Sequence, residues 1–414
     1  MWRLIYNLCV WAILPLFAAF SLTRKKIRGN FLERVFPAPL KGAPADIVWI
    51  HAASLGEAVI AENLVSYMRG AIPNPFLITT NTYYTRDLLR KKLGDGVKVR
   101  SLPFDLSCSI NRFMGASTFA ALILIETEIW PNLIWIARSR RVPVIVVNGR
   151  ISDATLGRYR RLAFFLKKVL SSVDVVLAQS EEQARRFVSL GLPPGRVIST
   201  GNLKYYRELE GRLEATAERH AATFGSIKER ELPFIIPVIR GLKRRFPDLC
   251  VFVAPREMHL VKAIEEELRK SYRVTRYSAI KGSGPKKGDV VLVDTVGDLV
   301  DIYRESGVAF VGGSLAPYGG QNVLEPLFVG TPVVFGPYVD NFKAVAETIV
   351  AQGAGFTVQD GDGLLSVMVS VLGNPFMRQG LVDAGKTVLA IQKGVMEKAA
   401  GHILETIWKN SQSS

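Results

Sequence analysis

The sequence predicts an α/β protein built from two Rossmann-like domains, each a doubly wound parallel sheet with covering helices. The chain has 414 residues, enough for two or three domains, and 48% of them are hydrophobic, enough for large packed cores. From Asp46 onward, apolar runs of strand length alternate with helix-like stretches. Such alternation is typical of parallel strands joined by helices. A polar segment, residues 206–219, interrupts the alternation, which then restarts.

The first half contains apolar runs that we predict to be strands: Ile47–His51, Phe76–Thr80, Val97–Leu102, Phe119–Glu126, Val142–Val147, Val173–Ala178 and Arg196–Thr200. The stretches between them favour helices, for example Ala58–Arg69, Tyr83–Lys92, Pro131–Arg138 and Glu181–Leu190.

The second half repeats the alternation, with predicted strands at Ala221–Ile227, Leu249–Ala254, Tyr272–Arg276, Val290–Val293, Val308–Val311 and Pro332–Phe335. Its predicted helices are Pro233–Arg245, His259–Lys270, Leu299–Glu305 and Phe342–Ala351, followed by one or two long helices within Asn374–Trp408. Ligands of such sheets bind at the carboxyl ends of the strands. We therefore expect the active site in a cleft between the two halves.

The N-terminus predicts a retained membrane anchor. Residues 2–22 are mostly apolar, and a basic cluster, residues 24–28, follows at once. About 20 apolar residues can cross a bilayer, and basic flanks stay in the cytoplasm. A cleaved signal peptide and a buried helix are the alternatives, but the basic cluster on the C-terminal side argues against cleavage.

The net charge of +16 favours an anionic partner such as a membrane surface, a nucleic acid or a phosphorylated substrate. Nine Lys and Arg residues fall between Arg138 and Lys168, around the apolar run Leu162–Leu166. This pattern indicates a surface helix on anionic lipid, although a solvated basic face also fits. No nucleic-acid motif is present. The three cysteines are far apart and form no cluster with histidine, so neither a disulfide framework nor a metal site is expected.

A glycine-rich stretch, Val311–Pro337, predicts a phosphate site. A strand leads into the pairs Gly312–Gly313 and Gly319–Gly320, and Asn322–Val329 is predicted to be a short helix. Strand, glycine loop and helix together place backbone N–H groups in front of a phosphate. Glu325, in the first turn of that helix, is a candidate to bind a ribose.

Two acidic motifs follow strands of the first half. Ser54 and Glu57, in HAASLGE, have the spacing of a helix capping box, but Glu57 could also accept a proton from a hydroxyl nucleophile, since a helix N-terminus keeps a carboxylate ionised. Glu126 and Glu128, in ETEIWPN, end a very apolar strand, where acids are costly to bury unless they are paired or used. The alternative is that they are ordinary first-turn acids and that Trp130 fills the core.

Three further charged residues are candidates to bind the substrate or to stabilise charge during the reaction. Lys204, in GNLKY, could stabilise negative charge on a leaving group, or be an ordinary surface lysine. Arg256, in VAPRE, could bind a phosphate through two N–H groups. Asp298, in DTVGDL, could hold a base or a ribose, or cap a helix.

These motifs occur in order over nearly the whole chain. Together with NGRIS and GGQNVLEPLFVGTPVVFGP, they resemble the 3-deoxy-D-manno-octulosonic acid (Kdo) transferases, which have the glycosyltransferase-B fold, two Rossmann-like domains with a cleft between them. The resemblance implies an inverting transfer from CMP-Kdo to the lipid A precursor in lipopolysaccharide biosynthesis. It implies Glu57 as the general base and Glu126 and Lys204 as transition-state stabilisers. It also implies CMP binding by Pro255, Arg256, Val296, Gly297, Asp298, Asn322, Val323, Leu324 and Glu325.

The resemblance further implies the inner membrane. The sequence itself predicts the cytoplasmic face with a single N-terminal anchor and an anionic membrane surface as a partner, and it gives no reason to expect a cofactor, metal or nucleic acid. The expected domains are an anchor at 1–23, an acceptor domain at 24–205, a linker at 206–220, a CMP-sugar domain at 221–385 and a C-terminal helix at 386–414.

The chain departs from the family pattern at several positions. In Ser226–Glu231, Lys228 replaces the usual His and Arg230 the usual Gly. Asp298 stands where Glu is common, and Gln321 where His is common. Another nucleotide-sugar enzyme of the same fold, such as a different sugar transferase or a 2-epimerase, is the alternative function. A non-catalytic, membrane-tethered binding protein is a further one.

Overall fold

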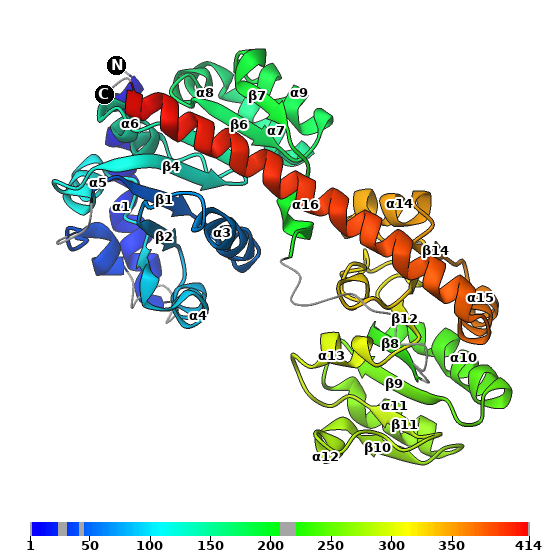
Figure 1. Ribbon diagram of the computed structural model, residues 1–414. Coiled ribbons are helices and arrows are strands. Elements are labelled where there is room, and N and C mark those ends of the chain that lie inside the picture. Colours follow the sequence, from blue (N-terminus) through cyan, green and yellow to red (C-terminus); the bar gives the residue numbers. More distant parts are fainter. Residues whose placement is uncertain (1, 24–30, 41–44, 208–220, 413–414) are drawn as a thin grey trace. The chain divides into compact units, whose positions relative to one another are not determined.

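The computed structural model describes residues 2–23, 31–40, 45–207 and 221–412. The chain divides into two compact units (Figure 1). The first unit comprises Met1–Tyr206 and Lys393–Ser414, and the second comprises Arg207–Gln392. Each unit is described by itself below.

The first unit is built on a seven-stranded parallel sheet with the order β3-β2-β1-β4-β5-β6-β7. Its strands are β1 Ile47–His51, β2 Phe76–Thr80, β3 Val97–Ser101, β4 Phe119–Ile125, β5 Val144–Gly149, β6 Val175–Ala178 and β7 Val197–Ser199.

Helices cover both faces of this sheet (Figure 1). They are α1 Trp2–Thr23, α3 Leu55–Met68, α4 Tyr83–Leu93, α5 Ser107–Met114, α6 Pro131–Ser139, α7 Asp153–Arg161, α8 Ala163–Leu170 and α9 Glu181–Ser189, with 3-10 turns η1 Gly94–Gly96, η2 Pro194–Arg196 and η3 Leu203–Tyr205.

Alternate residues of a strand point to opposite faces, so each strand contributes to two cores. In β1, Val48 and Ile50 join the core that also contains residues of α3, α4 and α16 (Pro375–Gln412). Ile47 and Trp49 join the core that also contains residues of α5, α6 and α8. Helix starts are fixed locally, since the hydroxyls that precede α3, α4, α7 and α9 accept a backbone N–H three residues later: Ser54, Thr82, Ser152 and Ser180.

The second unit contains another seven-stranded parallel sheet, with the order β10-β11-β9-β8-β12-β13-β14. Its strands are β8 Ala221–Ile227, β9 Cys250–Pro255, β10 Val274–Arg276, β11 Val290–Leu292, β12 Val308–Val311, β13 Val333–Phe335 and β14 Gly355–Thr357. Its helices are α10 Leu232–Arg245, α11 Leu260–Arg269, α12 Tyr277–Ile280, α13 Leu299–Arg304, α14 Lys343–Ala351 and α15 Gly361–Gly373, with 3-10 turns η4 Glu229–Glu231, η5 Leu327–Val329 and η6 Asp340–Phe342.

The strand predictions are largely confirmed. Ile47–His51, Phe76–Thr80, Ala221–Ile227 and Val308–Val311 have the predicted bounds, whereas β14 and α15 were not predicted. The C-terminal helix, expected at 386–414, begins in the structure at Pro375.

The predicted helix at Asn322–Val329 is wrong. The segment forms turns, and only the short 3-10 turn η5 is helical. The Asn322 side chain accepts the N–H of Leu324 at 3.2 Å, which supports a turn in place of a helical start. Gly330, with φ of 68°, then ends η5 in the left-handed region.

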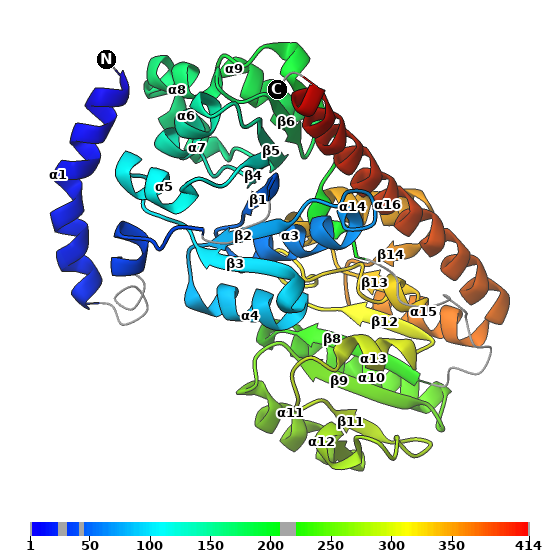
Figure 2. The same cartoon turned by 60° about the vertical axis from the view of Figure 1, so that its left-hand side comes forward.

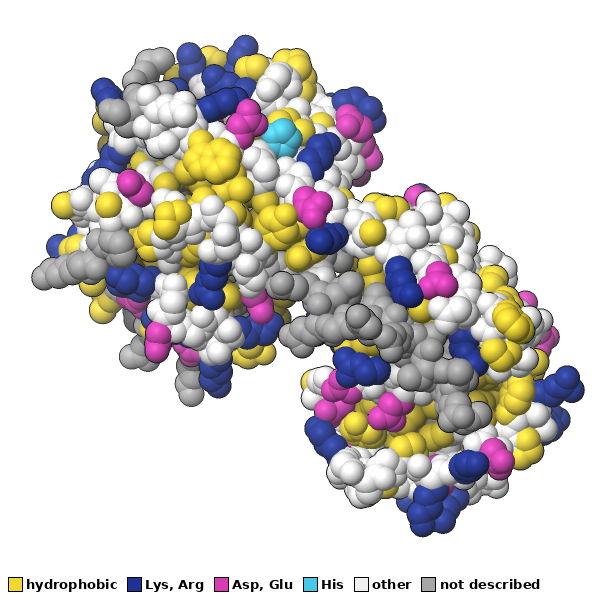
Figure 3. All heavy atoms as spheres, viewed as in Figure 1, with side chains coloured by type: hydrophobic (Ala, Val, Ile, Leu, Met, Phe, Trp, Pro, Cys, Tyr) yellow, Lys and Arg dark blue, Asp and Glu magenta, His cyan; other side chains and the backbone are white. Residues whose placement is uncertain are grey.

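The first helix packs against the first unit, as Figure 2 shows for α1 beside α5. Tyr6 Oη donates to Asp105 Oδ2 at 2.7 Å, and the amide of Asn7 donates to Asn132 Oδ1 at 3.1 Å. No helix among the described residues combines the length and the apolar character needed to cross a bilayer. Lys and Arg side chains are spread over the visible surfaces of both units, so the positive charge is not confined to one of them (Figure 3).

Both sheets reverse their strand order at one place. In the first sheet, β1 leads to β2 and β3 on one side and β4 lies on the other. In the second, β8 leads to β9 on one side and β12 lies on the other. Loops diverge at such a switch point and leave room for ligands beyond the carboxyl ends of the two strands. Each unit therefore has one favoured place for a site.

Candidate functional site

At the switch point of the first unit, the structure brings three carboxylates together. Glu57 lies in the first turn of α3, shortly after β1, and Glu126 and Glu128 follow the end of β4. The negative charges of Glu128 and Glu126 both raise the pKa of Glu57, so the three groups interact. The two acidic motifs, which are about 70 residues apart in the sequence, thus form one cluster because β1 and β4 are neighbouring parallel strands.

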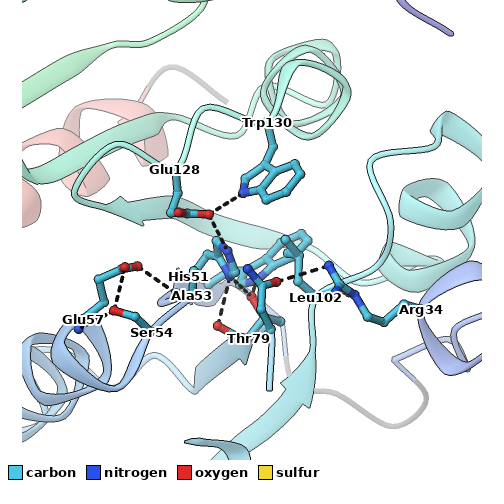
Figure 4. A network of polar contacts seen from close by, with 11 residues as sticks. Arg34, His51, Ala53, Ser54, Glu57, Thr79, Leu102, Glu128 and Trp130 are labelled. Carbon is cyan, nitrogen blue, oxygen red and sulfur yellow. Dashed lines mark hydrogen bonds and ion pairs between the residues drawn. The ribbon is translucent and has the colours of Figure 1, made fainter. Parts of the chain in front are cut away.

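Glu57 is held by its own helix start. Ser54 Oγ donates to Glu57 Oε1 at 2.8 Å, and the N–H of Ala53 donates to Oε2 at 2.7 Å (Figure 4). In return, the Glu57 N–H donates to Ser54 Oγ at 3.3 Å. The capping interpretation is therefore confirmed for Ser54, which accepts the Glu57 N–H. The Glu57 carboxylate departs from the capping box, because it accepts the N–H of Ala53 and not that of Ser54 itself. These bonds fix the carboxylate in one orientation.

Burial raises the pKa of the Glu57 carboxyl, and the hydrogen bonds from Ser54 and Ala53 oppose that rise without cancelling it. The residue is only 7% exposed. Desolvation is therefore the larger effect on this carboxyl and outweighs the hydrogen bonds at the helix start. A carboxylate with a raised pKa is a stronger proton acceptor once it is ionised.

Glu126 occupies a left-handed backbone conformation, with φ of 61°. Such a conformation is uncommon for a residue with a side chain and is concentrated at functional sites. Burial raises the pKa of Glu126, and the positive charges of Lys204 and Arg150 oppose the rise. Two cations are thus within electrostatic reach of this carboxylate.

Lys204 lies over the start of α3. A methyl group placed on Gly56 would be 3.9 Å from Lys204 Nζ, so the glycine leaves the ammonium close to the backbone beside Glu57. The preceding residue is held in place, since the Leu203 N–H donates to Asn148 Oδ1 at 3.0 Å. Asn148, from the NGRIS motif, therefore fixes the loop that presents Lys204.

The sequence analysis did not identify the partners of Glu128. His51 Nε2 lies 3.4 Å from Glu128 Oε2, and Trp130 Nε1 donates to the same oxygen at 2.8 Å (Figure 4). Burial favours a raised pKa for Glu128, but the nearby His51 and, to a smaller extent, Trp130 outweigh it and lower the pKa. Trp130 is therefore not simply core filling. Its position two residues after Glu128, with His51 at the end of the neighbouring strand, was the available signal.

The switch point of the second unit is organised by Glu231, which the sequence analysis also missed. This carboxylate is 0% exposed and accepts the N–H groups of Gly313 at 2.7 Å, Ser314 at 2.9 Å and Leu315 at 2.9 Å. It also accepts the N–H of Lys228 at 3.0 Å. A side chain of the same unit therefore takes up these three N–H groups of the glycine-rich stretch, of which only that of Gly313 belongs to the first glycine pair.

Five of the predicted CMP residues lie at the carboxyl ends of β9 and β11. Pro255 ends β9 and Arg256 follows it. Val296, 87% exposed, and Gly297, with φ of 101°, belong to the loop after β11. Asp298 follows them and precedes α13.

Asp298 caps no helix with its side chain. It pairs instead with Lys281 Nζ at 2.7 Å, and the hydrogen bond from Lys281 lowers its pKa. The alternative interpretation of Asp298 as a helix cap is therefore wrong.

The other four predicted CMP residues, Asn322 to Glu325, form a turn. Val323 and Leu324 are 0% exposed and can offer a ligand only their backbone. Burial raises the pKa of Glu325, and the hydrogen bond with Asn322 and the charges of Arg207 and Arg256 oppose the rise. Glu325 and Arg256 therefore lie within electrostatic reach of each other. Over the described ranges, no group of three His, Cys, Asp or Glu residues has the arrangement of a metal site.

Comparison with known proteins decides the family. A family model of 3-deoxy-D-manno-octulosonic-acid transferase (kdotransferase) matches residues 29–207. The 3-deoxy-D-manno-octulosonic acid transferase of Bordetella pertussis is 31% identical over 96% of this chain and 98% of its own length. The chain belongs to the Kdo transferase family. This Kdo transferase is therefore a glycosyltransferase enzyme.

A second relative of this Kdo transferase is the bifunctional glycosyltransferase/methyltransferase of Fusobacterium nucleatum, 32% identical over 79% of this chain. The chain spans about half, 52%, of that relative's length. Among solved structures, the UDP-GlcNAc 2-epimerase of Neisseria meningitidis bound to UDP-GlcNAc matches 88% of this chain and all of its own, with a TM-score of 0.57 and 12% identity. That likeness supports the glycosyltransferase-B type of fold and no more.

Proposed function

We propose that this enzyme transfers Kdo from CMP-Kdo to the lipid A precursor with inversion, and that Glu57 is the general base. The observation that carries the proposal is the environment of Glu57, a buried carboxylate with a raised pKa that two hydrogen bonds hold at the switch point of the first unit. A base must be positioned before its pKa matters, and both conditions are met here.

In the proposed reaction, a hydroxyl of the acceptor gives its proton to Glu57. The hydroxyl oxygen attacks the anomeric carbon of Kdo, the bond from that carbon to the phosphate oxygen breaks, and CMP leaves with the bonding electrons.

Lys204 and Glu126 are proposed to stabilise the transition state. Lys204 lies beside the start of α3 and within electrostatic reach of Glu126. The ammonium can offset negative charge on the departing phosphate, and Glu126 can offset positive charge that develops on the sugar ring. The left-handed backbone of Glu126 supports a functional role, since such a conformation is retained only where surrounding structure holds it.

For the donor, we propose that CMP is held by the loops that carry Pro255–Arg256, Val296–Asp298 and Asn322–Glu325. Arg256 is exposed at the end of β9, where a guanidinium can bind a phosphate through two N–H groups. Glu325 is mostly buried beside Arg256, and a carboxylate in such a position can accept ribose hydroxyls. Because Val323 and Leu324 have buried side chains, their part is confined to backbone contacts.

We also propose that α1 and α8 bring the enzyme to the cytoplasmic face of the inner membrane, with α1 as the single N-terminal anchor. The Trp2 ring packs edge-on against Phe164 of α8 at 4.5 Å between centroids. Apolar side chains of both helices remain more than half exposed, namely Leu4, Leu8, Trp11, Ile13 and Phe164. Arg158, Arg160, Arg161, Lys167 and Lys168 accompany them on α7 and α8. An apolar surface with basic neighbours suits anionic lipid.

The proposed function is tested with purified full-length enzyme, CMP-Kdo and a tetraacylated lipid A precursor. We expect mass spectrometry to show an acceptor that is heavier by one or more Kdo units, together with released CMP. Binding of CMP-Kdo without any new product would indicate the non-catalytic alternative. Release of CMP without a heavier acceptor would contradict the transfer.

A further inference from the structure

The second unit carries a group of cations at its switch point that the assignments above do not use. Lys228 follows the end of β8, and Arg230 lies in η4. Both surround the ring of Tyr318, with Lys228 Nζ at 5.3 Å and the Arg230 guanidinium carbon at 6.0 Å from its centroid. The Arg230 N–H also donates to Tyr318 Oη at 3.4 Å. Tyr318 belongs to the glycine loop after β12, so the loops after both central strands meet here.

The backbone beneath Lys228 is held rigidly. Its N–H donates to the buried Glu231, which also holds three N–H groups of the glycine loop. The side chain of Lys228 is only 18% exposed, although lysine side chains usually extend into solvent. Its ammonium pairs with Glu257, two residues after β9. An ammonium has three N–H donors, so one partner leaves others for a ligand.

Lys228 lies one strand away from the residue proposed to bind the donor phosphate. Ile227 pairs with Pro255 in the register of β8 and β9, and the Arg256 N–H donates to Ile227 O at 2.9 Å. Lys228 and Arg256 therefore follow paired positions on neighbouring strands, which are about 4.8 Å apart. The backbones of two cationic residues thus lie next to each other at the carboxyl edge of this sheet.

The donor has two anionic groups with matching geometry. Kdo is a sugar acid, and in CMP-Kdo its carboxylate and its phosphate-bearing oxygen are bonded to the same anomeric carbon. An enzyme that holds both groups needs two cationic positions close together. The N–H groups of Gly313, Ser314 and Leu315 in the glycine loop cannot serve as the second position, because Glu231 accepts them.

We propose that Lys228, with Arg230 and Tyr318 beside it, forms a subsite for the carboxylate of the sugar acid in the donor. The subsite distinguishes an acidic sugar donor from a neutral one, because only the acidic sugar supplies a carboxylate to the lysine. Arg256 remains the partner of the phosphate. Glu257 orients the ammonium, and its negative charge competes with the arriving carboxylate. This inference rests on the proposed function, since it assumes a CMP-linked sugar acid in the second unit.

The experiment compares CMP with CMP-Kdo as ligands of the full-length enzyme, without acceptor, by calorimetry. Lys228→Met should weaken the binding of CMP-Kdo about 10- to 100-fold, the loss expected for one hydrogen bond between charged groups. The same variant should bind CMP within about twofold of wild type, because CMP has no sugar carboxylate. Lys228→Arg keeps the positive charge and should retain most of the CMP-Kdo affinity.

Lys287→Met is the matched control. It removes the same charge from an exposed lysine of the same unit, but before β11, at the opposite edge of the sheet. It should leave the affinity for both ligands unchanged. Glu257→Gln removes the competing charge and should leave CMP-Kdo binding equal or tighter.

Three outcomes would overturn the subsite. Lys228→Met could weaken the binding of CMP and of CMP-Kdo equally, which would assign Lys228 to the phosphate. Lys228→Met could leave both affinities unchanged, which would mean that Lys228 serves only in the structural ion pair with Glu257. Wild-type enzyme could bind CMP-Kdo no more tightly than CMP. Failure of the proposed donor has a different signature, since wild-type enzyme would then bind neither ligand, whereas failure of the transfer alone appears only in the product assay described above.

Discussion

The switch points of the two units have the same topology, but the side chains that follow their central strands differ in kind. The first gathers Glu57, Glu126 and Glu128 beyond β1 and β4, whereas the second presents Lys228 and Arg256 beyond β8 and β9. A parallel sheet determines where loops diverge, but the side chains on those loops determine the chemistry. The first edge is suited to accept a proton, and the second to hold an anion.

Glu57 and Glu231 illustrate how two carboxylates at equivalent switch points can have different roles. Both carboxylates lie at a switch point and accept backbone N–H groups. Glu231 accepts four, from Lys228 and from three residues of the glycine loop, and is 0% exposed. Glu57 accepts one backbone N–H and one hydroxyl, and retains some exposure. We infer that Glu231 serves the fold, while Glu57 remains able to take a proton.

The largest expected effect comes from Glu57→Gln. The amide cannot accept the proton of the nucleophile, so kcat should fall by about 10²- to 10⁴-fold. Initial rates of CMP release with saturating CMP-Kdo and acceptor would measure it. Glu62→Gln, which alters a glutamate of the same helix paired at the surface with Lys92, is the control and should stay near the wild-type rate. A Glu57→Gln enzyme with wild-type kcat would falsify the assignment of the base.

Glu231→Ala should lower the stability of the second unit and not only the activity of the enzyme. Three buried N–H groups and the part-buried N–H of Lys228 would lose their acceptor, and unsatisfied buried groups cost about 1–3 kcal/mol each before relaxation. We expect a loss of at least about 3 kcal/mol in the free energy of unfolding of the second unit. Urea titration followed by circular dichroism would measure it. Glu229→Ala, on the same turn but exposed, should change it by less than about 0.5 kcal/mol; equal effects of the two substitutions would refute the role of Glu231.

The pH dependence follows from the raised pKa of Glu57. The base must be ionised, so kcat/KM should fall about tenfold per pH unit below the folded-state pKa, with a midpoint above the ordinary glutamate value of about 4.3. Rates across an acidic pH series would locate this limb. An acidic limb with its midpoint at the ordinary glutamate pKa would show that burial does not raise the pKa of Glu57.

The same shift affects stability in a defined direction. The folded protein binds this proton more tightly than the unfolded chain, so Glu57 favours folding fully below the unfolded pKa. That contribution is lost as pH rises through the higher folded pKa. Glu57→Gln should therefore unfold at higher urea concentration than wild type near neutral pH, and this advantage should shrink as the pH falls through the acidic range.

The smallest expected effect concerns Trp130→Phe, which removes one hydrogen bond to Glu128. Hydrogen bonds to charged groups contribute about 1.5 kcal/mol at the low end of their usual range. Because about 1.4 kcal/mol corresponds to a factor of ten, kcat/KM should fall roughly tenfold or less. Steady-state kinetics would measure the change. Trp135→Phe, on the helix that follows, is the control and should have little effect. Equal losses in the two variants would indicate that only packing matters at Trp130.

Much of the fold could be predicted from the sequence. Strand runs such as Ile47–His51 and Val308–Val311 are apolar at nearly every position, since strands of a sheet covered on both faces are buried throughout. Helix starts such as Ser54 have a local signal, because the hydroxyl satisfies an N–H three residues away. The helix predicted at Asn322–Val329 was wrong because a local side-chain bond and the left-handed Gly330 support turns instead.

The site was only partly predictable. Glu57, Glu126 and Lys204 belong to motifs, and the structure places all three at one edge of the first sheet. Glu231 ends the Ser226–Glu231 motif, but that motif does not reveal which groups its carboxylate binds. Its partners lie 82 to 84 residues away in the chain, in the glycine loop. The role of His51 likewise depends on Glu128, which a separate strand presents.

By itself, the sequence determined the alternation of strands and helices, the positive charge and the family motifs, because these depend on composition and on spacing within short segments. Only the tertiary structure decided the strand orders, the convergence of three carboxylates at one switch point, and the use of the glycine-loop N–H groups by Glu231. The physical reason is that a carboxylate acquires its pKa and its partners from neighbours that parallel strands bring together over long stretches of chain.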